Sequence, residues 1–213
     1  NFQKDLKNCK QIKFKKNRGV GFVRNFGAEK AKYENLFFID SDLVIEKNFF
    51  FILSRDFDKL KNPGSIGPIQ NYINLNNSTM TDFVCAKSCY GFEDVKEFLE
   101  FSAIRSECCL IKRKFLKAVG GWKSFSGAGG EEFDLGHRII KKGKINYLTK
   151  NTSYSHKWDD IFTRSKNIIS RTIKYLPIFL SRKKFETKGA FATFNQALSA
   201  LFTLLTLISI IFF

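Results

Sequence analysis

The sequence is poor in acidic residues. It holds 20 Asp and Glu against 36 Lys and Arg, so its formal net charge is +16. An imbalance of this size indicates an anionic partner: nucleic acid, a membrane surface or a phosphorylated substrate. Charge alone does not choose among the three.

The sequence also lacks the features of a secreted, disulfide-bonded domain. Its five cysteines are an odd number, and no secretory signal peptide opens the chain. We therefore expect free thiols in a reducing compartment. A zinc site is not expected, because Cys85-x-x-x-Cys89 with Cys108-Cys109 does not have the spacing of a zinc ribbon.

No internal repeat is present, and the 213 residues suffice for one α/β domain with an appendage. Strands are predicted at residues 11–14, 36–39, 65–72, 103–111 and 145–148. Helices are predicted at residues 21–35, 44–60, 114–119, 131–142 and 159–184, the last with a break near Pro177. Residues 82–101 give no clear pattern.

What the sequence does have is an apolar strand that ends on two carboxylates. The run Leu36 to Ile39 is followed directly by Asp40-Ser41-Asp42. A short apolar run of this kind is typical of a buried strand in a parallel sheet, and open α/β sheets place their chemistry just beyond such strands. The two carboxylates suit Mg²⁺ or Mn²⁺ that also binds substrate phosphates. A simple helix cap or turn is the structural alternative.

A second acidic cluster opens the helix predicted at residues 131–142. Glu131 and Glu132 project from its first turn, and Asp134 caps or holds the preceding loop. The helix N-terminus would stabilise these charges, which is a structural explanation. The functional explanation is a general base that acts on an acceptor hydroxyl. His156, after the strand at 145–148, is either a structural residue or a ligand.

The ordered set of motifs resembles family 2 glycosyltransferases of the GT-A fold, from about Gln11 to His156. The motifs that carry the resemblance are Arg24-Asn25-x-Gly27-x-x-x-Ala31, Asp40-x-Asp42, Gly120-Gly121-Trp122, Gly130-Glu131-Glu132-Phe133-Asp134-Leu135-x-x-Arg138 and Gly143. The fold it implies is a Rossmann-like, mostly parallel α/β sheet in a catalytic domain of residues 1–158.

The resemblance implies a nucleotide-diphospho-sugar donor and a single displacement that inverts the anomeric carbon. Asp42, with Asp40, would hold Mg²⁺ or Mn²⁺ against the diphosphate. Arg24 and Asn25 would lie near the nucleotide, with Asp40 also on the donor side. A diphosphate leaving group is stabilised by such an ion and by basic residues.

The catalytic base implied by the resemblance is Glu132, where the family usually has Asp. The longer side chain leaves the choice between Glu132 and Glu131 open. His156 matches a position at which some members place a metal or phosphate contact. The acceptor side would be formed by Cys109, Gly130, Asp134 and Trp158.

Family members normally begin with a strand and helix that build the base-binding half of the nucleotide pocket. Few residues precede the strand predicted at Gln11. We therefore expect an N-terminally truncated GT-A domain, which binds the donor poorly or is inactive by itself.

The end of the chain differs in composition from the rest. Ala190 to Phe213 has no charged residue, and at 1.5 Å per residue it is long enough, at roughly 35 Å, to cross a bilayer core of about 30 Å. This predicts a transmembrane helix at 190–213, preceded by basic, amphipathic membrane-surface helices at 159–189. The basic side would be cytoplasmic. The catalytic cleft would then face an acceptor on a lipid carrier or a growing envelope glycan.

Two alternatives to a membrane-anchored glycosyltransferase are considered. A nucleic-acid-binding protein would place basic residues and interleaved aromatics on one face. Here the densest basic cluster adjoins the apolar end, and the aromatics are mostly Phe within apolar runs, so no nucleic-acid partner is expected. The second alternative is a catalytically inactive scaffold, from which metal-dependent donor binding would distinguish an enzyme.

Overall fold

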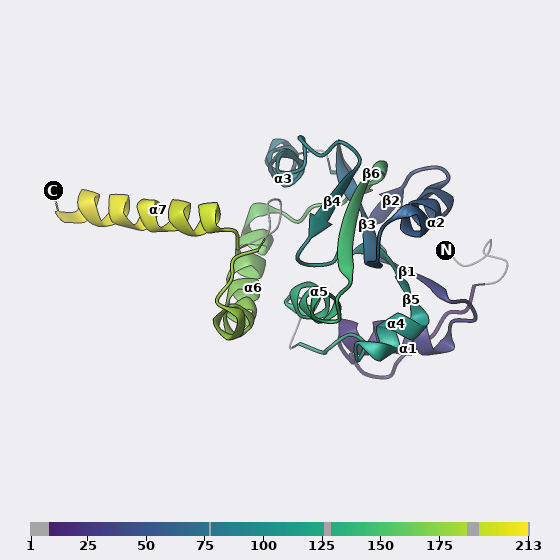
Figure 1. Cartoon of the computed structure of the whole chain (residues 1–213). Coiled ribbons are helices and arrows are strands. Elements are labelled where there is room, and N and C mark those ends of the chain that lie inside the picture. Colours follow the sequence, from purple (N-terminus) through teal and green to yellow (C-terminus); the bar gives the residue numbers. More distant parts are fainter. Residues whose placement is uncertain (1–8, 77, 126–128, 187–191, 213) are drawn as a thin grey trace.

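One mixed sheet organises the fold of the computed structural model, which describes residues 9–76, 78–125, 129–186 and 192–212 (Figure 1). In this part of the chain the strand order is β1-β5-β3-β6-β2, and β4 pairs with β6 beside that path. The strands are β1 (Asn35–Ile39), β2 (Leu43–Ile45), β3 (Pro63–Asn74), β4 (Phe98–Phe101), β5 (Cys108–Lys112) and β6 (Ile145–His156).

The expectation of a mostly parallel sheet is wrong. Among the described strands only β3 and β6 run parallel to each other, while β5 is antiparallel to β1 and β3, and β6 is antiparallel to β2 and β4. β1 lies at one end of the strand order, and of its residues only Leu36 is buried.

Helices cover both faces of the sheet (Figure 1). On one face α1 (Val20–Lys30), α4 (Arg113–Ala118) and α5 (Glu131–Lys141) enclose a core that includes Leu36, Ile111 and Leu135. On the other face α2 (Phe49–Lys59) packs Phe49, Leu53 and Phe57 against Ile66 and Leu110. α3 (Thr79–Tyr90) lies next to β3.

Several elements differ from their predicted bounds because tertiary contacts decide them. The predicted helix 44–60 begins as β2, whose branched residues pair with Tyr154–His156, and turns helical only at Phe49. The strand predicted at 11–14 is absent from the described residues; there, Phe14 packs edge-on against Phe22 and Phe26 of α1. β5 begins only at Cys108, so residues 103–107 form a loop, and β6 extends past Leu148 to His156.

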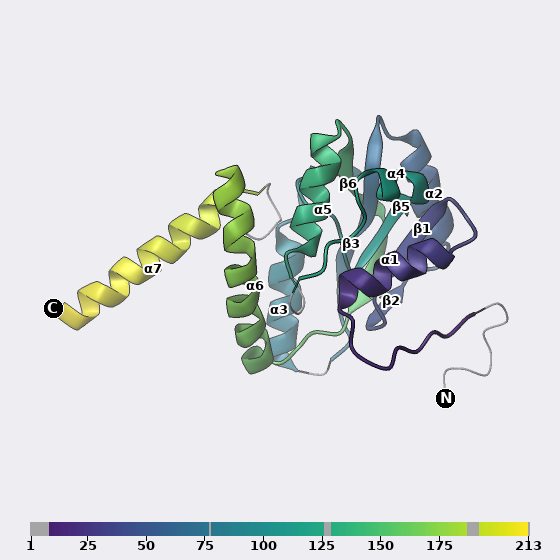
Figure 2. The same cartoon turned by 90° about the horizontal axis from the view of Figure 1, so that it is seen from below.

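A helical arm follows the sheet domain. α6 (Ile161–Arg182) runs beside α5, and α7 (Phe194–Phe212) projects away from the body (Figure 2). The predicted break at Pro177 does not occur, because α6 continues through it. Tyr175, Ile178 and Phe179 on either side of the proline pack into a core cluster with Phe133, and this packing offsets the cost of the proline.

The expectation of a transmembrane helix is not supported. In the described residues no helix is both long and apolar enough to cross a membrane. The uncharged run begins at Ala190, but α7 begins at Phe194, and residues 190, 191 and 213 of the predicted span lie outside the described residues.

Candidate functional site

Arg24 joins the two acidic clusters that the sequence singles out. Its side chain is only 9% exposed, and its Nη2 donates to Asp40 Oδ1 at 2.9 Å. Its Nη1 lies 3.9 Å from Glu131 Oε1 and has no hydrogen-bond partner. The guanidinium also lies over the ring of Trp122, 4.6 Å from the ring centroid. The chain therefore brings the end of β1 and the start of α5 together at one guanidinium.

Asp40 and Asp42 have different surroundings. Asp40 is held by Arg24, and its backbone N–H donates to Glu107 O at 2.9 Å. Burial raises the pKa of Asp40 above its usual value, against the opposing pull of Arg24. Asp42 instead lies 3.2 Å from His156 Nε2 through its Oδ2, and about half of its side chain is exposed. The two side chains are similarly exposed, at 43% and 49%, so their partners distinguish them.

His156 reaches Asp42 because β2 pairs with β6. Leu43 lies opposite His156 in this register, so the residue that follows Asp42 fixes the histidine beside it. His156 Nδ1 is buried without a hydrogen-bond partner. The ring packs edge-on against Trp158, with 4.7 Å between the ring centroids. The three-residue strand β2 thus positions His156, the predicted metal ligand.

Glu131 and Glu132 also differ in their hydrogen-bond partners. Glu131 is buried, and its Oε2 accepts the Gly129 N–H at 2.8 Å in addition to the ion pair with Arg24. Glu132 Oε2 is buried with no hydrogen-bond partner. Burial, and then the charge of Glu131, raises the pKa of Glu132 to about 7. A carboxyl with a pKa near neutrality is suited to accept a proton.

A partly buried charged cluster behind these groups was missed by sequence reasoning; the side chains of Arg105 and Glu107 are 15% and 28% exposed. Glu107 accepts a 2.8 Å hydrogen bond from the Tyr154 hydroxyl and lies 3.5 Å from Arg105 Nη1. Burial alone would raise the pKa of Glu107, but the Arg105 guanidinium and these hydrogen bonds lower it below its usual value. The Glu107 charge acts on the carboxyls of both Asp40 and Glu132 and raises the pKa of each.

The sequence contains a feature that could have predicted this cluster. Two charged residues, Arg105 and Glu107, fall within a stretch that the sequence predicts as a strand, and charged groups are seldom buried without a role. α5 packs closely against this loop at Gly136. Any larger residue there would clash, since a Cβ would lie only 2.6 Å from Ala103 Cα. Ile104 N also donates to the backbone oxygen of Glu132 at 3.2 Å. The loop therefore positions the start of α5.

Asn25 and Asp134 hold a loop. The Asn25 amide donates to Trp122 O and accepts from Trp122 N, both at 2.8 Å, so both ends of its carboxamide are occupied. Asp134 binds Arg138 Nε and Nη2 at 2.8 and 2.6 Å, and Arg138 in turn donates to Gly121 O at 2.7 Å. The motifs that contain these residues thus contact one another around the 120–122 turn. Asn25 is thus used at least in part to hold this turn.

The remaining predicted acceptor-side residues fall into two classes. Cys109 is 1% exposed in the core beneath Arg24, and burial raises the pKa of its thiol to about 12. It therefore supports the site from below and has no surface for an acceptor. Gly130 begins α5 with φ +96, and Trp158 lies beside His156. Both of these lie at the side of the cleft that α6 approaches.

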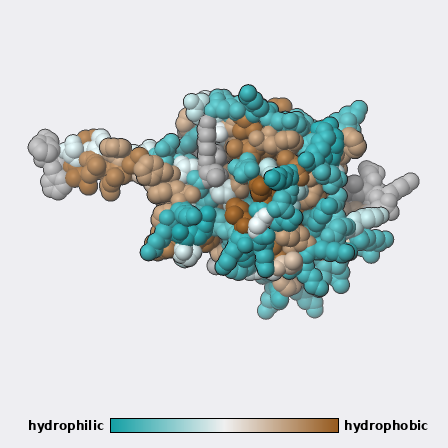
Figure 3. Space-filling model, viewed as in Figure 1, coloured by the Kyte–Doolittle hydropathy of each residue, from teal (hydrophilic) through white to brown (hydrophobic). Residues whose placement is uncertain are grey.

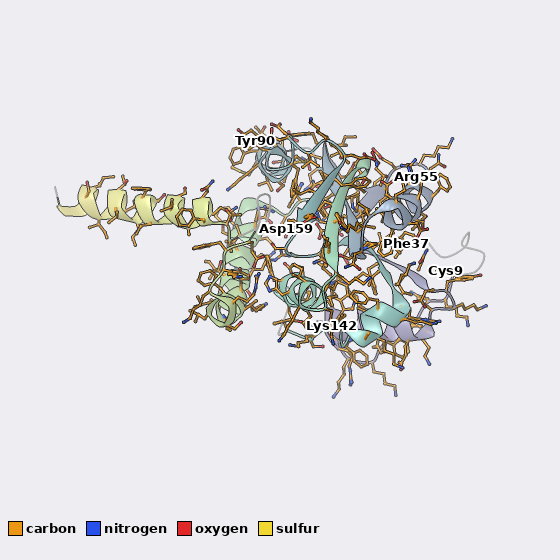
Figure 4. The ribbon with its side chains drawn as sticks, viewed as in Figure 1. Cys9, Phe37, Arg55, Tyr90, Lys142 and Asp159 are labelled. Carbon is orange, nitrogen blue, oxygen red and sulfur yellow. The ribbon has the colours of Figure 1, made fainter. Side chains whose placement is uncertain are left out.

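α6 contributes two arginines to this side. Arg164 lies over the ring of Trp158, 4.6 Å from its centroid. A Cβ on Gly129 would lie 2.6 Å from the Arg171 side chain, so α6 rests directly on the loop that precedes the glutamates. The Arg171 charge acts to lower the pKa of Glu132, against the larger effect of burial. Asp159, labelled in Figure 4, marks where the chain passes from β6 to this helix.

The residues present are compatible with a divalent ion shared with a substrate. No three His, Cys, Asp or Glu side chains converge as a complete metal site in the part of the chain that the structure describes. Mg²⁺ and similar ions often take only one or two protein ligands and complete their coordination with phosphate oxygens and water. Asp42 and His156, adjacent and partly exposed, fit that pattern, whereas the Asp40 carboxylate is shared with Arg24.

Comparison with known proteins gives a family and a fold. The family described as "Glycosyltransferase like family 2" matches residues 2–167. None of the curated proteins compared with the chain matches it. The chain is similar to the crystal structure of GalNAc-T7 with UDP, GalNAc and Mn²⁺, with a TM-score of 0.54 and 17% identity over 69% of this chain and 32% of that chain. At this identity the likeness shows the α/β, GT-A-like fold, and the chain spans about a third of that protein.

A further solved structure has a lower score. It is the mannosyltransferase PcManGT from Pyrobaculum calidifontis in complex with GDP-Man and Mn²⁺, with a TM-score of 0.49 and 13% identity over 70% of this chain and 39% of that chain.

Proposed function

Because the chain belongs to the family described as glycosyltransferase like family 2, we propose that it transfers a sugar from a nucleotide-diphospho-sugar to an acceptor hydroxyl. The observation that carries this proposal is the state of Glu132. Its carboxyl has a buried oxygen without a hydrogen-bond partner and a pKa raised to about 7, and its sequence neighbour Glu131 shares Arg24 with Asp40. A structural carboxylate would be paired, as Glu131 is.

In this proposal Glu132 is the general base. Its deprotonated carboxylate takes the proton of the acceptor hydroxyl as the oxygen attacks the anomeric carbon of the donor. The bond to the diphosphate breaks in the same displacement, which inverts that carbon. Glu131 does not compete for this role, because its carboxylate is engaged by the Gly129 N–H and by Arg24.

Asp42 and His156 would hold Mg²⁺ or Mn²⁺ against the donor diphosphate. A divalent ion there would offset the charge that develops on the leaving group. Arg24 positions Asp40 beside this site and supplies a fixed positive charge. The UDP and Mn²⁺ in the GalNAc-T7 structure are consistent with a nucleotide-diphosphate donor and a metal requirement.

The acceptor side of the proposal rests on the groups that α6 covers. The ring of Trp158 and the cations Arg164 and Arg171 lie near the loop that carries Glu132. An aromatic ring beside charged donors is suited to a glycan that bears an anionic group. We propose the hydroxyl of a lipid-linked or envelope glycan as the acceptor.

The test is turnover of UDP- and GDP-sugars by the 213-residue chain with Mn²⁺, followed as nucleotide release. Glu132→Gln should lower turnover by about a hundredfold or more, the usual scale for removing a general base, while donor binding persists. Glu131→Gln is the matched control and should retain most of the turnover. A loss confined to Glu131→Gln would transfer the base role to that residue.

An inactive scaffold predicts a different result. It would bind the nucleotide and Mn²⁺, yet Glu132→Gln and the unaltered chain would release nucleotide at the same rate. That outcome would overturn the enzymatic proposal while keeping the donor site.

A further inference from the structure

α6 has two faces with different chemistry. Its inner face packs Tyr175, Ile178 and Phe179 into the core, and Arg171 rests on Gly129 at the entrance to the cleft. Its outer face carries large apolar side chains that contact no core cluster of the described residues. A surface helix normally turns its apolar stripe inward and its polar face to water. α6 is apolar on both sides.

The outer stripe is regular. Its members recur at spacings of seven, four, three and four residues, and each is between 52% and 78% exposed: Phe162, Ile169, Ile173, Leu176 and Leu180. At about 100° per residue, these positions fall within an arc of roughly 60°. Exposed apolar patches of this extent mark a surface that binds something.

Every charged residue within α6 is basic, and the exposed acids nearest the stripe, Asp159 and Asp160, lie just before its first turn. α6 contains no Asp or Glu. Lys166 on the helix, and Lys183 and Lys184 just after it, are exposed. An apolar stripe bordered by lysines is the pattern of helices that lie in the plane of an anionic membrane surface.

α7 continues this surface. Its large apolar side chains between Phe194 and Ile210 are exposed, and Figure 3 shows the helix as a mainly brown rod beyond the teal and brown body. α6 and α7 thus both present exposed apolar side chains outside the sheet domain. Nothing in this arrangement requires the chain to cross the bilayer.

We propose that the outer stripe of α6 binds the surface of an anionic bilayer as a peripheral contact. The apolar side chains enter the boundary between headgroups and acyl chains, and the lysines contact anionic headgroups. The opposite face of the same helix keeps Arg164 and Arg171 on the cleft. The consequence that the cleft meets a lipid-borne acceptor rests on the proposed function, whereas the membrane contact does not.

A second copy of the chain is a less favourable occupant of the stripe. Two stripes brought together would also bring together their flanking lysines, and like charges oppose such contact. An anionic bilayer supplies both an apolar interior and the opposite charge.

The first experiment is sedimentation of the full chain with vesicles of phosphatidylcholine alone or mixed with phosphatidylglycerol. We expect binding that requires phosphatidylglycerol and weakens with salt. Ile173→Asp should weaken it at least about tenfold, through loss of apolar burial and added repulsion. Ile73→Asp on β3 is the matched control, because Ile73 is 60% exposed and Ile173 is 66% exposed. The control should bind as the unaltered chain does.

The second experiment separates α6 from α7. Cys9 is exposed and the other four cysteines are buried, so a Cys9→Ser background allows an environment-sensitive dye to be placed at Ile173→Cys or at Ile73→Cys. With phosphatidylglycerol vesicles, the emission should shift to the blue at position 173 and not at 73. If the chain sediments with vesicles without a shift at 173, the stripe is not the contact and the proposal fails.

The remaining outcomes are equally decisive. If the chain does not bind vesicles and Ile173→Asp converts a dimer to a monomer, the stripe is a self-association surface and the proposal is wrong. Calorimetric titration of Ile173→Asp with UDP or GDP and Mn²⁺ keeps the two proposals apart. Unchanged nucleotide binding with lost vesicle binding supports the membrane contact whether or not the proposed transferase activity is found.

Discussion

The two acidic pairs of the cleft, one at the end of β1 and one at the start of α5, repeat the same arrangement. In each pair one carboxylate is tied to Arg24: Asp40 at 2.9 Å and Glu131 at 3.9 Å. The other member is differently placed. Asp42 lies beside His156 with half its side chain exposed, and Glu132 keeps a buried oxygen unpaired.

The comparison teaches that neighbours in a motif do not share a role. Asp40 and Glu131 form the frame that holds two distant segments together through one guanidinium. Asp42 and Glu132 are left with capacity for a ligand or a proton. An arginine suits this frame, because its planar group can serve two carboxylates at once.

Among the changes in nucleotide binding, the largest should come from replacing Asp42 and not Asp40. Asp42→Asn should weaken Mn²⁺-dependent nucleotide binding at least about tenfold, because even outer partners of a metal site cost that much when lost. Calorimetric titration with and without Mn²⁺ measures it. Asp40→Asn, the matched control, should keep more of the metal dependence. Equal losses of Mn²⁺-dependent binding in the two variants would contradict the assignment of metal binding to Asp42 and not to Asp40.

The pH dependence of turnover should follow Glu132. Its pKa is raised to about 7, and only the deprotonated carboxylate can act as a base. Turnover should therefore rise with pH up to about 7 and fall about tenfold for each pH unit below it. Initial rates across this range test the sign. A plateau that persists to about pH 5, near the ordinary carboxyl range, would contradict a raised pKa at the base.

The smallest effect should come from Arg24→Lys. Lysine keeps the charge but loses the planar fork, so the frame between Asp40 and Glu131 weakens. We expect the free energy of unfolding to fall by about 1–2 kcal/mol, measured by urea unfolding. Arg55→Lys is the control, because Arg55 pairs with its sequence neighbour Asp56 at 2.8 Å and bridges no distant segments. An equal decrease in the free energy of unfolding of both variants would contradict a bridging role for Arg24.

Local sequence patterns predicted the parts of the fold that they can specify. The apolar run before Asp40 forms β1, and the acids, apolar spacing and final glycine around residues 131–143 form α5. Both depend on neighbours in sequence. The family and the GT-A-like fold were also recognisable from the order of the motifs.

The rest depends on contacts between distant segments. β2 looked helical because its apolar residues continue into α2, and only its pairing with β6 makes it a strand. Glu107 carries no motif, and its place behind Asp40 follows from the β1–β5 register and the Tyr154 hydroxyl. Asn25 matched a donor motif, yet its carboxamide is used by the backbone of Trp122.

The helices α6 and α7 also could not be predicted fully from local sequence. An uncharged run predicted a membrane span, but helix bounds are set by the backbone and not by composition alone, and α7 is shorter than the run. The two faces of α6 could be assigned only once Tyr175 and Phe179 were placed in the core.

The most direct test of the central claim is calorimetric titration of the 213-residue chain with UDP and with GDP, each with and without Mn²⁺. We predict that one nucleotide binds only when Mn²⁺ is present, and that Glu132→Gln binds it as well as the unaltered chain does. Nucleotide binding of equal strength with and without Mn²⁺ would contradict a donor site built around Asp42 and His156.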